Sequence, residues 1–131
     1  MKYLFLLFAF LFSVAAQAQT YQNADTVSCP DLLENIYVRP LYSDSLSSSF
    51  VIFIKKEVKL HKHSAHTEHV IVLEGVGTMV LGDSTFTIKK GDVVFIPKGT
   101  AHKVVTLSKE PLKVISIQSP YFDGSDRLML E

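Results

Sequence analysis

Short apolar runs separated by turn residues follow one another along most of the chain. The runs are rich in Val, Ile, Phe and Thr, and such side chains favour a pleated strand. They lie at residues 36–38, 50–54, 70–73, 78–81, 85–88, 93–96, 104–107 and 112–117. Pairs such as Glu74-Gly75 and Gly82-Asp83 separate them at roughly 8–12-residue intervals, the spacing of a sandwich or barrel of short strands. The pattern predicts an all-β protein, and about eight strands with two apolar faces predict a jelly roll.

The first residues follow a different pattern. Lys2 precedes a run of apolar residues over 3–14, and the small residues Ala16 and Ala18 follow. This layout predicts a secretory signal peptide over residues 1–18. The run is shorter than the roughly 20 residues that a membrane-spanning helix needs. We therefore expect cleavage, no stable membrane anchor afterwards, and a periplasmic or secreted protein; an uncleaved anchor is the alternative.

The mature chain is expected to form one domain. Cleavage after residue 18 of 131 leaves 131 − 18 = 113 residues, enough for a single hydrophobic core. Residues 19–34 are polar and aperiodic, which predicts a flexible lead-in, although Asp31 after Pro30 can cap a short helix over 31–35. The single domain is expected over residues 35–131.

Charge and cysteine content narrow the classes of partner and fold. The chain has 13 basic and 13 acidic residues, so nothing in its net charge predicts a nucleic-acid partner. Cys29 is the only cysteine, which excludes an internal disulfide. A packed core must therefore stabilise the fold.

Four of the five histidines lie between residues 61 and 69. His61 and His63 are two apart, so on a strand they share a face at roughly 6.5–7 Å and can lean onto one ion. Glu68 follows after a short loop and adds a carboxylate. Nitrogen and oxygen ligands together suit Fe, Mn, Zn, Ni or Cu as a divalent ion. The alternative is a solvated histidine-rich loop that binds no metal.

The other two histidines of this cluster fit a ligand role less well. His69 follows Glu68 directly, so on a strand it would point to the opposite face. His66 lies in the loop, where it is either a proton shuttle at a barrel mouth or an exposed residue without a function. Both are interpreted first as exposed bystanders.

Two spaced motifs extend this picture. The first is H-x-H, four residues, E, six residues, G, and the second is G, five residues, P-x-G, two residues, H; they place His61, His63, Glu68, Gly75, Gly91, Pro97, Gly99 and His102. In both spacings the chain resembles the cupin superfamily over about residues 50–117. It departs from the family pattern at Lys55, where glycine is frequent, and at Thr106, where asparagine is frequent. Neither position binds metal in that pattern.

The resemblance implies a double-stranded β-helix with one divalent transition metal inside the barrel. The first motif would span two strands and supply His61, His63 and Glu68, and the second would supply His102 from across the barrel. Cupins commonly pair, so a homodimer is a candidate assembly, with residues 36–41 as an edge or exchanged strand. The tail over 119–127 is expected to pack or to form a pocket wall.

Three functions remain open from the sequence. The first is a small metalloenzyme acting on an oxygen-rich small molecule, dioxygenase-like or isomerase-like, with Glu68 also serving as a base. The second is a metal-dependent protein that binds a sugar or carboxylate without turnover. In the third, the metal only stabilises the barrel. The sequence does not determine which metal is bound, which substrate is used or whether turnover occurs.

Overall fold

The described part of the chain folds into ten short strands and one turn of 3-10 helix. The computed structural model describes residues 21–131, so the predicted signal peptide lies outside the described residues. The elements are η1 (Ala24–Thr26), β1 (Ile36–Ser43), β2 (Ser48–Ile54), β3 (Glu57–Lys62), β4 (Thr67–Glu74), β5 (Val76–Leu81), β6 (Ser84–Lys89), β7 (Val93–Ile96), β8 (His102–Thr106), β9 (Leu112–Ser119) and β10 (Leu128–Met129).

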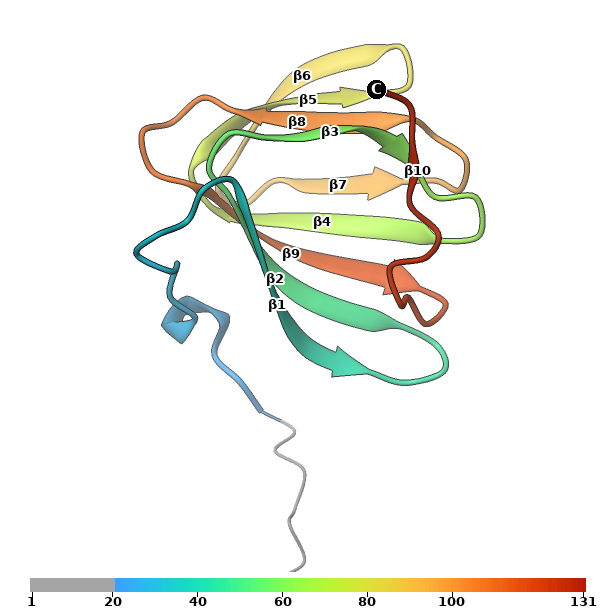
Figure 1. Cartoon of the computed structure of the whole chain (residues 1–131), viewed down its shortest axis with the longest axis horizontal. Helices are drawn as coiled ribbons and strands as arrows, with labels where there is room; N and C mark the ends of the chain where they lie inside the picture. Colours follow the sequence, from blue (N-terminus) through green and yellow to red (C-terminus); the bar gives the residue numbers. More distant parts are fainter. Residues whose placement is uncertain (1–20) are drawn as a thin grey trace, which may run out of the picture.

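The strands form two antiparallel five-stranded sheets that face each other. One has the order β1-β2-β9-β4-β7, and the other the order β10-β3-β8-β5-β6. Figure 1 shows them as two layers, with the C-terminal tail crossing one end. Alternate side chains of both sheets point inward and bury a shared core that includes Val72, Met79, Ile96, Leu112 and Val114. The predicted all-β jelly roll is confirmed.

Two strands and one helix differ from the sequence-based expectations. Strand β3 has the sequence EVKLHK, in which charged and apolar residues mix, and β10 has only two residues, so neither was predicted as an apolar run. The short helix predicted over 31–35 is wrong, because that stretch forms a turn at 31–32 and bends at 34–35. The helical turn lies earlier, where the Asn23 side chain accepts a hydrogen bond from the Asp25 amide and caps η1.

The segment before β1 packs on the outer face of the β1–β2–β9 region. Leu33 joins Val51 and Phe53 in a second, smaller core, against which Val27 and Cys29 also pack. The flexibility predicted for residues 19–34 stays a prediction.

Strand β1 is an edge strand, as one reading of residues 36–41 predicted. A homodimer formed through this edge stays a prediction. Within residues 21–131, no helix has the length and apolar character needed to cross a membrane.

Candidate metal centre

Three strands and one tight turn bring the predicted ligands together. His61 lies on β3 and pairs in register with His102, the first residue of β8. His63 follows the end of β3, and Glu68 is the second residue of β4. Gly99 has φ +74°, and its amide donates to the His63 carbonyl over 2.7 Å, which ties the turn before His102 to the first motif. All four predicted ligand side chains are buried.

The three imidazoles gather at one point, and the Glu68 carboxylate lies beside two of them. One nitrogen from each of His61, His63 and His102 lies within 4.8 Å of the other two. Glu68 Oε2 is 3.4 Å from His63 Nε2 and 3.5 Å from His102 Nε2. Two ligand atoms each about 2.1 Å from an ion are about 3.0–3.4 Å apart at octahedral or tetrahedral angles. These two carboxylate–imidazole distances therefore suit atoms that share an ion, and the imidazoles are expected to close in on binding.

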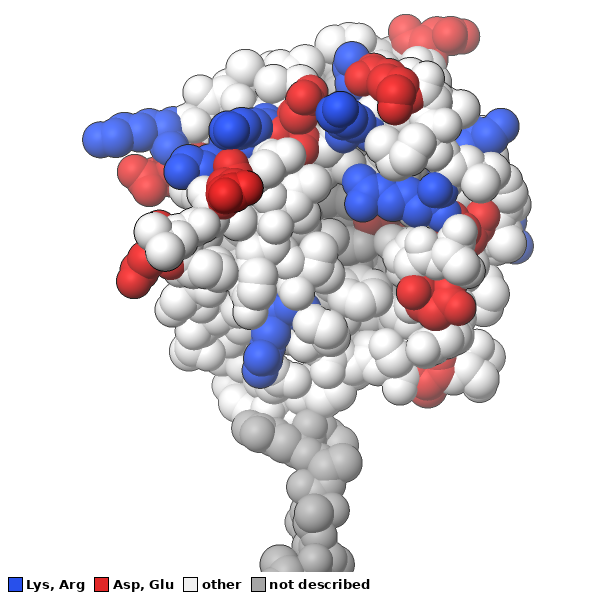
Figure 2. Space-filling view, viewed as in Figure 1, with Lys and Arg blue, Asp and Glu red and all other residues white. Residues whose placement is uncertain are grey.

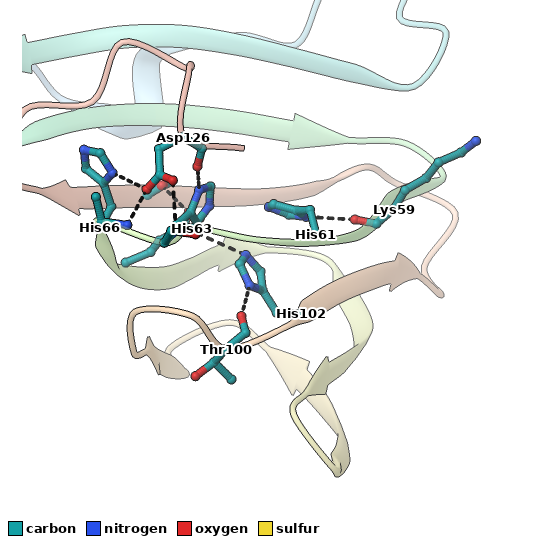
Figure 3. A network of polar contacts seen from close by, with 11 residues as sticks. Lys59, His61, His63, His66, Thr100, His102 and Asp126 are labelled. Carbon is teal, nitrogen blue, oxygen red and sulfur yellow. Dashed lines mark hydrogen bonds and ion pairs between the residues drawn. The ribbon is translucent and has the colours of Figure 1, made fainter. Parts of the chain in front are cut away.

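Backbone carbonyls fix the orientation of all three imidazoles (Figure 3). Nδ1 of His61 bonds to the Lys59 carbonyl over 2.8 Å, and Nδ1 of His102 bonds to the Thr100 carbonyl over 3.0 Å. His63 Nδ1 bonds to the Asp126 carbonyl over 2.5 Å. A carbonyl only accepts, so each Nδ1 carries the hydrogen and Nε2 is left to offer a lone pair. Metal-binding histidines are oriented in this way.

One buried atom shows that the residues fit a metal. His102 Nε2 is buried, and among residues 21–131 it has no hydrogen-bond partner; its contact with Glu68 does not reach hydrogen-bond geometry. A buried polar atom without a partner destabilises the fold unless something else binds it. Three clustered imidazoles with a carboxylate beside two of them are a donor set for a divalent transition metal. The structure and the motif therefore indicate a metal site, while the identity of the ion stays open.

The pKa values of His61 and His63 are shifted in opposite directions. Burial, followed by the nearby His102, lowers the pKa of His61 to about 4. Burial alone would lower the pKa of His63, but its contacts with the Glu68 carboxylate and the Asp126 carbonyl outweigh burial and raise it. A proton on His63 would have to leave before a metal binds, so metal binding is expected to release protons.

Glu68 is held as a carboxylate. Burial would raise its pKa, but the imidazoles of His102 and His63 and the hydroxyl of Ser116 hold that pKa well below its usual range. Ser116 Oγ donates to Glu68 Oε1 over 2.5 Å. A carboxylate with a low pKa accepts a proton poorly, and its negative charge suits a neighbouring cation; the assignment of Glu68 as a ligand stays a prediction. The predicted second role of Glu68 as a base stays a prediction.

The C-terminal tail supports the centre in a way that sequence reasoning missed. Asp126 accepts hydrogen bonds from the Ser64 and Ala65 amides at 2.9 and 2.7 Å, and lies 2.6 Å from His66 Nδ1. The Asp126 carboxylate thus clamps the loop between the first two histidines and Glu68. No local pattern signals it, because Asp126 is 60 residues from His66 in the chain.

His66 and His69 differ in their exposure to solvent. His66 is buried, so its interpretation as an exposed residue is wrong; its Nε2 also bonds to the Tyr121 carbonyl over 2.9 Å. His69 is exposed and lies against Phe95, with the two ring centroids 4.9 Å apart, on the outer face as predicted.

A cavity of about 580 Å³ leads to the metal centre. This size falls in the range of small-molecule sites. The four predicted ligands line it together with apolar residues of both sheets and with Tyr121 and Phe122 of the tail. The tail therefore forms a pocket wall, as expected. Figure 2 shows a hollow near the middle of one face, with acidic and basic side chains mixed around it.

Comparison with known proteins agrees with the fold and the motifs. Residues 50–118 match the cupin domain family, and the chain belongs to it. An uncharacterized protein of Aquifex aeolicus is 34% identical over 99 residues, which cover 76% of this chain and 81% of that protein. An uncharacterized protein of Methanocaldococcus jannaschii is 35% identical over 81 residues, which cover 62% of this chain and 65% of that protein, just under two thirds of its length.

A solved structure shows the same architecture. A conserved protein of Klebsiella pneumoniae with a double-stranded β-helix domain superposes with a TM-score of 0.74 at 17% identity. The match covers 87% of this chain and 99% of the Klebsiella chain. The likeness establishes the double-stranded β-helix fold that the motifs implied.

Proposed function

We propose that this protein is an exported metalloenzyme that acts on an oxygen-bearing small molecule, in a dioxygenase-like or isomerase-like reaction. The observation that carries the proposal is a cluster of three buried imidazoles, with a carboxylate beside two of them, at the wall of a cavity large enough for a small molecule. A divalent ion held there would polarise an oxygen atom of the ligand.

The chain's own residues would hold the ion, orient its ligands and shield the ion from solvent. His61, His63, Glu68 and His102 would bind the ion, and Ser116 keeps the Glu68 carboxylate in place. A bound ligand that fills the cavity would displace water from the apolar barrel walls, which would strengthen electrostatic interactions inside the site. Export to the periplasm or medium rests on the signal-peptide pattern of residues 1–18. Homodimerisation through β1 is part of the same proposal.

Metal content and turnover test the proposal together. The mature protein is purified, its metals are identified by elemental analysis, and oxygen uptake is measured against catechols, diketones and enediols. Isomerisation is followed in parallel by the incorporation of deuterium from D2O into the same compounds. We expect about one transition metal per chain and turnover in one of the two assays.

His61→Ala should abolish turnover and lower metal content, because one of the four ligands is removed. His69→Ala is the matched control, since His69 lies one residue beyond Glu68 but is exposed on the outer face. A wild-type protein without stoichiometric metal would refute the proposal. Bound metal together with ligand binding but no turnover would favour the non-catalytic binding protein instead.

A further inference from the structure

Gln118 is a buried polar residue that neither the core nor the metal centre uses. Its side chain is 5% exposed and lines the cavity. Within the described part of the chain, its Oε1 atom is buried without a hydrogen-bond partner. Leaving such an atom unpaired destabilises a fold by about 1–3 kcal/mol. An unpaired amide beside a ligand cavity is therefore a candidate for ligand recognition.

The strand register places this amide beside the metal centre. Gln118 on β9 is the direct cross-strand partner of Glu68 on β4. Directly opposite residues of antiparallel strands have Cβ atoms about 4.5–5.5 Å apart. A ligand atom bound next to Glu68 would therefore have its neighbouring atom within reach of the Gln118 carboxamide.

Most of the remaining cavity wall is apolar, and the charged residues Lys103, Asp123 and Arg127 also line the cavity. The apolar part includes Ile52 and Ile54 from β2, Val70 from β4 and Val114 from β9, while Ile36 and Val38 line it from the edge strand β1. Hydroxyl groups facing such walls would lose their hydrogen bonds to water without replacement, which is costly. The wall therefore disfavours a sugar, whose hydroxyl groups surround its whole body.

We propose that Gln118 is a specificity-determining residue, and that the ligand is an amphipathic molecule with two adjacent oxygen groups at one end. One oxygen would bind at the metal centre, a neighbouring hydroxyl would bond to the Gln118 carboxamide, and an apolar body would fill the barrel. This inference rests on the proposed function for the position of the metal, and it names the class of ligand.

Three probes separate the parts of the inference: 2-hydroxyhexanoate, hexanoate, and lactate. Isothermal titration calorimetry on the metal-loaded protein should show 2-hydroxyhexanoate binding about tenfold more tightly than hexanoate, the value of one hydrogen bond. It should bind up to about 60-fold more tightly than lactate, because each of three buried methylenes contributes about fourfold. Gluconate, with hydroxyls along its length, should bind more weakly than 2-hydroxyhexanoate.

Gln118→Met tests the residue itself. The preference for the hydroxy acid should fall to within twofold, while hexanoate affinity and metal content stay within about twofold of wild type. The melting temperature should not fall, because an unpaired polar atom has been removed. Ile117→Met is the control, since it places the same side chain one residue away on the outward-facing side of β9; it should keep the tenfold preference.

Several results would overturn the inference. These are an unchanged preference in Gln118→Met, gluconate as the tightest probe, no binding by any probe, or a lower melting temperature in Gln118→Met, which would mark Gln118 as structural. The titrations are repeated without metal, because the walls and Gln118 contact the ligand body whether or not an ion is bound. Failure to bind metal would thus refute the proposed function, while the ratios between probes judge Gln118 separately.

Discussion

Replacing Ser116 by alanine should weaken metal binding without disturbing the barrel. Ser116 is completely buried, and its hydroxyl donates to Glu68 Oε1 over 2.5 Å. The substitution would leave only a small cavity between buried strands, so water would have little access to replace this hydrogen bond. A hydrogen bond to a charged group contributes about 1.5–3 kcal/mol, which corresponds to about 10–150-fold in an equilibrium constant. Loss of such outer-shell partners typically costs about 10–100-fold in metal affinity.

We therefore expect Ser116→Ala to raise the dissociation constant for Zn(II) about 10–100-fold. The measurement is competition with a fluorescent chelator of known affinity at pH 7.5. Ser49→Ala is the control, because Ser49 lies on the neighbouring strand β2 and bonds only to the backbone of Tyr42. Thermal unfolding of the metal-free proteins establishes that both variants fold.

A folded Ser116→Ala protein that binds Zn(II) within twofold of wild type would refute this reasoning. It would show either that Glu68 does not bind the ion or that its position does not depend on Ser116. Glu68→Gln helps to separate these two explanations, since loss of a carboxylate ligand should lower affinity more than loss of a neighbouring negative charge alone.

Three further predictions concern pH, backbone and tail. Because the pKa of His61 is lowered to about 4 in the folded state, His61 is protonated in the unfolded chain but neutral in the folded protein between about pH 4 and 6.5. The contribution of His61 to the free energy of unfolding of the metal-free protein should therefore fall as the pH is lowered through that window. Urea titrations should show this slope reduced in His61→Asn, and an equal slope would contradict the assignment. Gly75→Ala should destabilise by about 2 kcal/mol or more, because Gly75 has φ +82° and a Cβ there would lie 2.9 Å from a Cα atom of β9. Gly91→Ala, with φ +92° but open space around the added Cβ, should lower the free energy of unfolding by less in the same urea titrations. Equal losses in the two variants would rule out a steric contribution at Gly75. Asp126→Asn should speed hydrogen exchange at the Ser64 and Ala65 amides, and unchanged protection of both would show that the carboxylate does not clamp the loop.

The sequence by itself determined the class of fold and named the residues at its centre. Runs of β-branched residues with glycine turns predict strands because side-chain alternation and turn geometry are local properties. The two motifs are also local, since a fixed spacing along strands and a tight turn places His61, His63, Glu68 and His102. The structure gathers the three histidines and puts Glu68 beside His63 and His102, while the binding of an ion by all four stays a prediction. Strand β3 was harder to recognise, because its half-exposed position allows lysines that obscure the apolar pattern.

Only the tertiary structure decided what surrounds that centre. Ser116 is 48 residues from Glu68, and Asp126 is 60 residues from His66, so no spacing rule links them. Gln118 reads in the sequence as an ordinary polar residue near a strand end, and only its register opposite Glu68 places it at the cavity. These contacts depend on which strands become neighbours. That choice is made by burial of the whole core and not by any short stretch of the chain.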